Sequence, residues 1–93
     1  MLIKKIEQQL IHTINKQLQT DFLIIVGSFA KGTEHKNSDI DIVYSSNQYL
    51  SATEHSMLIS DLVKISEREV DLIDFKKVDS DFELHVLTEG LPI

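Results

Sequence analysis

The sequence contains no cysteine, which excludes a disulfide framework and any metal site built on thiolates. Long hydrophobic runs are also missing. The longest, residues 22–26, is far shorter than the about 20 apolar residues that a membrane-spanning helix needs. The first residues, 1–7, lack the continuous apolar stretch of a secretory signal. We therefore expect a cytoplasmic protein with no membrane partner, and the absence of cysteine fits that reducing compartment.

Basic residues are scarce as well. Nine lysine and arginine residues stand against fifteen aspartate and glutamate residues, which gives a net charge of −6. The adjacent basic pairs are Lys4–Lys5 and Lys76–Lys77. Because nucleic-acid-binding proteins neutralise phosphates with clustered basic side chains, we expect no direct nucleic-acid binding. An acidic protein of this size would more easily meet a basic protein partner.

The length and the hydrophobic pattern predict one domain that spans residues 1–93. Apolar residues at steps of three and four predict helices, and short β-branched or alternating segments predict strands. Capping-box patterns mark helix starts at Ser51 and Ser80. The predicted elements, in the order α-β-β-α-β-α, are a helix over 3–18, strands over 21–26 and 39–44, a helix from 51, a strand over 69–75 and a helix from 80 to Gly90. This order predicts the α+β class, with a small mixed β-sheet and helices packed on one face.

A turn with two glycines follows the first predicted strand. Gly27 ends that strand, Ser28 comes next, and Gly32 lies a few residues further on. Because glycine has no Cβ atom, backbone N–H groups can approach a phosphate closely, and the Ser28 hydroxyl can add a hydrogen bond. A plain turn would explain Gly27 alone, but it would not explain Ser28, Gly32 and the aspartates that follow. The turn therefore predicts a phosphate-binding site.

Asp39 and Asp41 lie two residues apart on the next predicted strand. They therefore point to the same face, with Cα atoms roughly 6–7 Å apart. Two carboxylates at this separation can bracket one or two hard cations, whereas without a cation they would repel each other and raise their pKa values. Taken alone, the pair could be the solvated face of an amphipathic strand. Together with the glycine turn, it predicts a site for a metal–nucleotide complex.

Gly27-Ser28, ten further residues and Asp39-Ile40-Asp41 together resemble the signature of the nucleotidyltransferase superfamily. The likeness is greatest to the minimal nucleotidyltransferase (MNT) antitoxins, which are partners of HEPN-domain toxins. It extends from the leading helix to residues 86–90 and implies the nucleotidyltransferase fold. That family takes a third carboxylate from a later strand, and Asp71 occupies the corresponding position here.

The resemblance implies catalytic and metal-binding roles for three carboxylates, those of Asp39, Asp41 and Asp71. It implies Mg²⁺ (or Mn²⁺) as the cofactor and ATP as the substrate. The implied nucleotide-binding residues are Gly27, Ser28 and Lys31. Lys31 stands where many relatives carry arginine, so it keeps the positive charge but lacks the bidentate fork.

The same resemblance implies an enzyme that acts as an antitoxin, a protein adenylyltransferase. It would transfer AMP from ATP to a hydroxyl, that of a tyrosine, on a partner HEPN RNase toxin. One alternative is a non-catalytic antitoxin that masks the toxin by binding, and another is nucleotidyl transfer to a small molecule. The sequence leaves open the acceptor, the base preference, the oligomeric state and whether Asp71 is a metal ligand or a general base.

Other polar residues are expected to have no special role. Asp74, three residues after Asp71, points to the opposite face of the strand and is predicted to be a surface charge at the strand end. The histidines show no metal-ligand spacing and are predicted to lie on the surface; they are His12, His35, His55 and His85.

Overall fold

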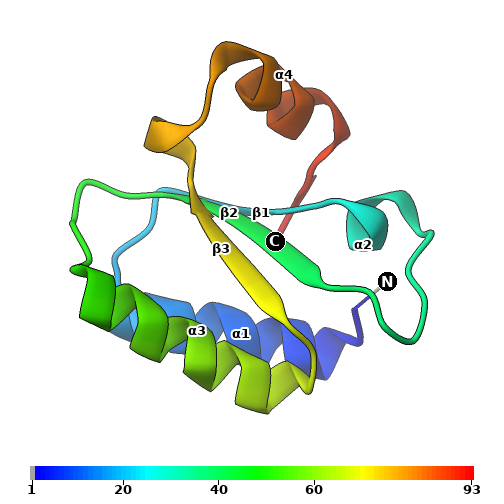
Figure 1. Cartoon of the computed structure of the whole chain (residues 1–93), viewed down its shortest axis with the longest axis horizontal. Coiled ribbons are helices and arrows are strands. Elements are labelled where there is room, and N and C mark those ends of the chain that lie inside the picture. The colour runs from blue at the N-terminus through cyan, green and yellow to red at the C-terminus, as the bar shows by residue number, and fades with distance from the viewer. Residues whose placement is uncertain (1) are drawn as a thin grey trace.

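The computed structural model describes residues 2–93 as a four-stranded mixed sheet with helices above and below it (Figure 1). The strand order is β3-β2-β1-β4. The elements are α1 (Lys4–Gln17), β1 (Phe22–Val26), α2 (Ser28–Lys31), β2 (Ile40–Ser45), α3 (Ala52–Ser66), β3 (Val70–Asp74), a 3₁₀ turn (Phe75–Lys77), α4 (Ser80–Glu89) and β4 (Leu91–Pro92). Within residues 2–93, no helix is both long and apolar enough to cross a bilayer.

The directions of the strands decide which residues meet at one edge of the sheet. β2 runs antiparallel to β1 and parallel to β3. The parallel pair needs a long crossover, which α3 supplies. Because β2 and β3 start at the edge where β1 ends, the end of β1 lies beside the starts of the other two strands. In the register, Val26 pairs with Asp41, and Asp41 pairs with Asp71.

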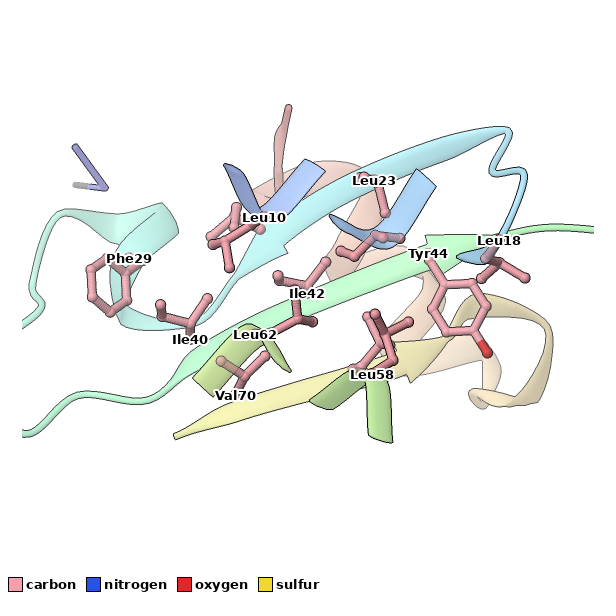
Figure 2. Packing of buried hydrophobic residues seen from close by; sticks show 13 residues of the cluster. Leu10, Leu18, Leu23, Phe29, Ile40, Ile42, Tyr44, Leu58, Leu62 and Val70 are labelled. Carbon is pink, nitrogen blue, oxygen red and sulfur yellow. The ribbon is translucent and has the colours of Figure 1, made fainter. Parts of the chain in front are cut away.

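The main core lies between the sheet and the helices α1 and α3. Leu10 and Ile14 of α1, and Leu58 and Leu62 of α3, are completely buried there. Figure 2 shows this core, with Phe29 and Ile40 at one end and Tyr44 and Leu18 at the other. Each buried leucine or isoleucine contributes about 1.5–3 kcal/mol of transfer free energy. The prediction of these two helices and their apolar faces is confirmed, as is the capping box in which Ser51 and Glu54 bond to each other's backbone N–H groups.

The expectation that the helices pack on one face of the sheet is wrong for α4. This helix covers the opposite face (Figure 1), where Val86 is buried against Ile24, Val26 and Val43. The reason lies in β1, whose side chains from Leu23 to Val26 are all buried. A strand that is apolar at every position must be covered on both faces, and α4 covers the second one.

The two ends of α4 also differ from the expectation. The capping residue is Asp79, whose carboxylate accepts a hydrogen bond from the N–H of Phe82 at 2.8 Å; Ser80 is already inside the helix. Gly90 ends the helix with an ordinary negative φ of −74°. Its lack of a side chain matters for space, because a Cβ atom there would collide with Ile24 Cγ2 and the carbonyl oxygen of Val86. After Gly90 the chain joins the edge of β1 as β4, a fourth strand that the pattern did not predict.

Replacing Gly90 by alanine should therefore lower the free energy of unfolding by about 1–3 kcal/mol, because the added methyl group must push apart α4 and β1. Urea denaturation followed by circular dichroism measures the change. Glu89→Ala, at the exposed neighbouring position, is the control and should have little effect. Equal midpoints for the Gly90→Ala variant and the unmodified chain would show that the gap has room for a side chain.

Candidate functional site

The glycine turn at the end of β1 has a backbone that only glycine adopts easily. Gly27 has φ 74° and ψ −150°, and its carbonyl oxygen accepts hydrogen bonds from the N–H groups of Ala30 and Lys31 at 3.1 and 3.2 Å. These bonds start the short helix α2. The N–H groups of Ser28 and Phe29 precede them, and first-turn amides have no partner within their own helix. The turn therefore has the form expected of a phosphate-binding loop.

Gly27 also lies directly against the carboxylate of Asp41. A Cβ atom built on Gly27 would stand 2.6 Å from Asp41 Oδ2, which is closer than such atoms can pack. The backbone angles therefore call for glycine, and any side chain here would also force the Asp41 carboxylate to move. This contact brings the predicted phosphate turn and one of the predicted metal ligands together.

The three aspartates singled out in the sequence share one neighbourhood. Asp41 is half-buried in β2, its register partner Asp71 lies on β3 at the strand spacing of about 4.8 Å, and Asp39 immediately precedes β2. Burial raises the pKa of Asp41 above its usual value, and the negative charges of Asp71 and then Asp39 raise it further. The carboxylates are thus close enough to repel one another.

This donor set has the chemistry of a site for a hard cation, although it does not form a closed cage. Within residues 2–93, no three histidine, cysteine, aspartate or glutamate side chains already converge as a complete ligand set. Mg²⁺ does not need one, because it keeps several waters and usually takes one or two carboxylates plus substrate phosphates. A cation would also offset the repulsion that raises the pKa of Asp41. The residues therefore fit Mg²⁺ delivered with a nucleotide.

Two lysines that could reach phosphates are exposed. Lys31 ends α2, and Lys36 lies in the loop before Asp39. An open hollow of about 250 Å³ lies beside that loop and is lined by Asp39 and Arg68 among other residues. Lys31 thus lies at the end of the turn that begins with Gly27, which is the turn predicted to bind phosphate.

Sequence reasoning missed Arg68, which stands in the turn between α3 and β3. Its Nη1 atom donates hydrogen bonds to the carbonyl oxygens of His35 and Ser38 at 3.0 Å and of Lys36 at 3.3 Å. Its guanidinium carbon lies 4.9 Å from the centre of the Phe29 ring. No local sequence pattern predicts these contacts, because the partners lie some 30 or more positions away along the chain.

The expectation that His55 is a surface residue is wrong. Asp74 lies at the strand end as expected, but it also has a structural role. His55 is half-buried, and its Nε2 atom bonds to the carbonyl oxygen of Leu72 at 2.9 Å, so it ties α3 to β3. The carboxylate of Asp74 accepts a hydrogen bond from the N–H of Lys76 at 2.9 Å and caps the 3₁₀ turn. Neither residue belongs to the candidate site.

The two glycines of the turn allow a matched test. Gly32→Ala puts a side chain into open space at φ 72° and should cost about 1–2 kcal/mol of stability. Gly27→Ala adds a collision with Asp41 to a stronger backbone strain and should cost about 3 kcal/mol or more. Urea unfolding of both variants measures the difference. Equal losses would mean that the Asp41 carboxylate does not rest against Gly27.

The raised pKa of Asp41 predicts a dependence of stability on pH. Folded Asp41 keeps its proton to a higher pH than unfolded Asp41, so its contribution to stability is present below the ordinary value of 3.8 and is lost as the pH rises through the raised pKa. Without divalent cations, Asp41→Asn should therefore increase the free energy of unfolding at pH 7 and gain less near pH 3. Urea titrations at both pH values test this, with Asp61→Asn on α3 as the control. A loss of stability at pH 7 would contradict the prediction.

Comparison with known proteins agrees with this geometry. The family model described as "Polymerase beta, Nucleotidyltransferase" matches residues 8–93. The putative protein adenylyltransferase MJ1379 of Methanocaldococcus jannaschii is 31% identical over 91 residues, which cover 96% of this chain and 91% of that protein. The protein adenylyltransferase MntA of Shewanella oneidensis is 31% identical over 68 residues, 73% of this chain. That match spans only about half of MntA, 49% of its length.

Solved structures show the same fold. A toxin–antitoxin structure with AMP-PNP superimposes with a TM-score of 0.84 at 26% identity, over 92% of this chain and 70% of that chain. A structure of a tri-AMPylated Shewanella oneidensis HEPN toxin in complex with its MNT antitoxin gives 0.78 at 20% identity, over 96% and 69%. At 20% identity the likeness shows the fold alone. The family model covers nearly the whole chain, and this chain therefore belongs to the polymerase β-type nucleotidyltransferase family.

Proposed function

We propose that this protein is an antitoxin that adenylylates its partner, transferring AMP from ATP to a tyrosine hydroxyl of a HEPN-domain RNase toxin in the cytoplasm. The observation that carries the proposal is the contact between Gly27 and the carboxylate of Asp41, with Asp71 in register beside it. It unites a phosphate-binding turn with an acidic metal site, and nucleotidyl transfer requires both.

The choice of AMP and of a protein acceptor draws on the relatives. Two of them, each 31% identical to this chain, carry the name protein adenylyltransferase, one of them as putative. A structure with this fold contains AMP-PNP, an adenine nucleotide, and another pairs an MNT antitoxin with an AMPylated HEPN toxin. A protein acceptor could reach this site, because the side chains of Asp39 and Asp71 are exposed at the edge of the sheet.

The reaction assigns a role to each residue of the site. The N–H groups after Gly27 and the hydroxyl of Ser28 bind the β- and γ-phosphates, and Lys31 adds positive charge on the same turn. Asp39 and Asp41 would hold Mg²⁺ (or Mn²⁺) brought in with the nucleotide. Such a metal, when bound, would neutralise phosphate charge and favour attack at phosphorus.

The transfer itself exchanges one phosphorus–oxygen bond for another. The tyrosine oxygen attacks the α-phosphorus, the bond to the β-phosphate oxygen breaks, and pyrophosphate leaves. The phenolic proton passes to a carboxylate or to water. Asp71, on the strand next to Asp41, would accept that proton or complete the metal site.

A second candidate function is inhibition by binding alone. The net charge of −6 and the exposed leucines of α4, Leu84 and Leu87, would suit a surface that covers a basic protein. The two mechanisms differ in whether inhibition survives removal of this protein, because a phosphodiester on tyrosine does not dissociate.

The test is to incubate the purified toxin with this protein, ATP and Mg²⁺ and to measure the intact mass of the toxin. We expect the toxin to gain AMP units and to stay inactive after this protein is removed. Asp39→Asn should leave the fold and the binding of the toxin unchanged but should lower transfer at least about 100-fold, because a metal-binding carboxylate is lost.

The matched control is Asp61→Asn, which removes the same charge from α3 and should transfer AMP normally. If Asp39→Asn protects against the toxin fully, without added mass and without ATP, inhibition by binding is the mechanism. In that case inhibition should be stoichiometric and should reverse on dilution according to the dissociation constant.

A further inference from the structure

Arg68 is the only arginine in the chain, and its place in the fold is unusual. It lies between the end of α3 and the start of β3, in a turn where Glu67 adopts the left-handed conformation with φ 58°. Its backbone N–H donates to the hydroxyl of Ser66, and that hydroxyl also bonds to the carbonyl oxygen of Leu62 at 2.9 Å. These backbone contacts anchor the turn to α3, independently of the contacts that the Arg68 side chain makes.

The side chain of Arg68 holds the loop that carries Asp39. Three carbonyl oxygens, those of His35, Lys36 and Ser38, lie within 3.3 Å of its Nη1 atom. Carbonyl oxygens crowded around one point repel each other, and a cation at that point removes the repulsion. Hydrogen bonds from a charged donor are roughly twice as strong as neutral ones. Arg68 thus offsets the repulsion among these three carbonyl oxygens and holds the loop in place.

The loop has its own hydrogen bonds, but they are local. The N–H of Ser38 donates to the carbonyl oxygen of His35, the N–H of His35 donates to Ser38 Oγ, and the N–H of Asn37 donates to His35 Nδ1. These bonds shape residues 35–38 into a turn without tying that turn to the sheet. Next to Asp39, the N–H of Ile40 donates to the carbonyl oxygen of Glu69 at 2.9 Å, and the three bonds from Arg68 tie residues 35–38 to the same α3–β3 turn.

The same guanidinium contacts the other half of the site. It lies over the ring of Phe29, which belongs to α2 and is buried with only 4% of its surface exposed. Phe29 is the second residue after Gly27. Arginine suits this double role because its planar group can stack on a ring with its face while its edge donates hydrogen bonds. Arg68 therefore bridges the phosphate turn and the loop of Asp39.

We propose that Arg68 is a positioning residue that fixes Asp39 relative to the Gly27 turn, so that carboxylate and phosphate-binding amides face the same metal–nucleotide complex. The inference rests on the proposed function for its purpose, and on the three carbonyl contacts and the Phe29 contact for its geometry. Arg68 does not itself have to touch the substrate. It acts through the loop that ends at Asp39.

The experiment combines hydrogen exchange with nucleotide binding. Arg68→Met keeps the apolar stem and removes the charge and the donors. We expect exchange of the loop amides of residues 35–38 to become at least about tenfold faster, because charge-assisted bonds are lost. Calorimetry should show the affinity for ATP with Mg²⁺ to fall by about tenfold. Arg68→Lys, which restores a cation with three donors but not the planar group that stacks on Phe29, should recover part of both effects.

The matched control is Lys64→Met, which removes a positive charge from the exposed side of the last turn of α3 and should change neither measurement. Unchanged loop exchange in Arg68→Met would overturn the proposal, as would faster exchange spread evenly over α1 and α3, which would mean a general loss of stability. If Arg68→Met does not fold, Arg68→Lys and Arg68→Gln are compared in the same way, and equal loop exchange in these two would overturn it.

The two proposals fail in different ways. Should the unmodified chain bind no ATP with Mg²⁺, the proposed function is lost, while the exchange of residues 35–38 still decides whether Arg68 orders the loop. Should ATP bind normally and the Arg68 variants bind equally well, the proposed function stands and the positioning role is lost.

Discussion

The pairing of three strands in one register is the constraint on which the site depends. Val26, Asp41 and Asp71 form one row across β1, β2 and β3. That row brings Gly27 against the carboxylate of Asp41, although the two residues are far apart in the sequence. A slip of one residue in β2 would turn Asp41 toward the main core and expose Ile40 or Ile42 instead. Burial of these two isoleucines therefore keeps Asp41 on the opposite face of the strand.

Much of this arrangement follows from local patterns. The helices α1 and α3 and the strands β1 to β3 have clear periodicities, and Gly27, Ser28, Asp39 and Asp41 form a motif with fixed spacing. The side covered by α4 could have been inferred from the continuous apolar run of β1, which needs cover on both faces. β4 and the role of Arg68 could not, because a two-residue strand and a single arginine acquire their meaning only from partners distant in sequence.

The site is built at a cost to stability. Burial and two neighbouring charges raise the pKa of Asp41, and Gly27 beside it has backbone angles that any other residue would adopt only with strain. In the proposed function, groups that repel each other in the free protein would become complementary to a cation and a triphosphate, and binding would relieve the repulsion. Arg68 adds positive charge on the carbonyl side of the Asp39 loop and joins that loop to α2 through Phe29. Arg68 therefore orders the loop, while the repulsion between the carboxylates, which raises the pKa of Asp41, comes from other residues of the same site.

The crossover through α3 also has a consequence for the order in which the protein folds during synthesis. The phosphate turn is complete by residue 32, but Arg68 and Asp71 follow only after the whole of α3. Parallel pairing of β2 with β3 closes a long loop, and such contacts form late because closing a loop costs chain entropy before any contact compensates for it. During synthesis, a chain released only as far as α3 holds the turn and two aspartates without the elements that fix them. The proposed affinity for a nucleotide should thus arise in one step, when β3 docks, and not gradually as the chain lengthens.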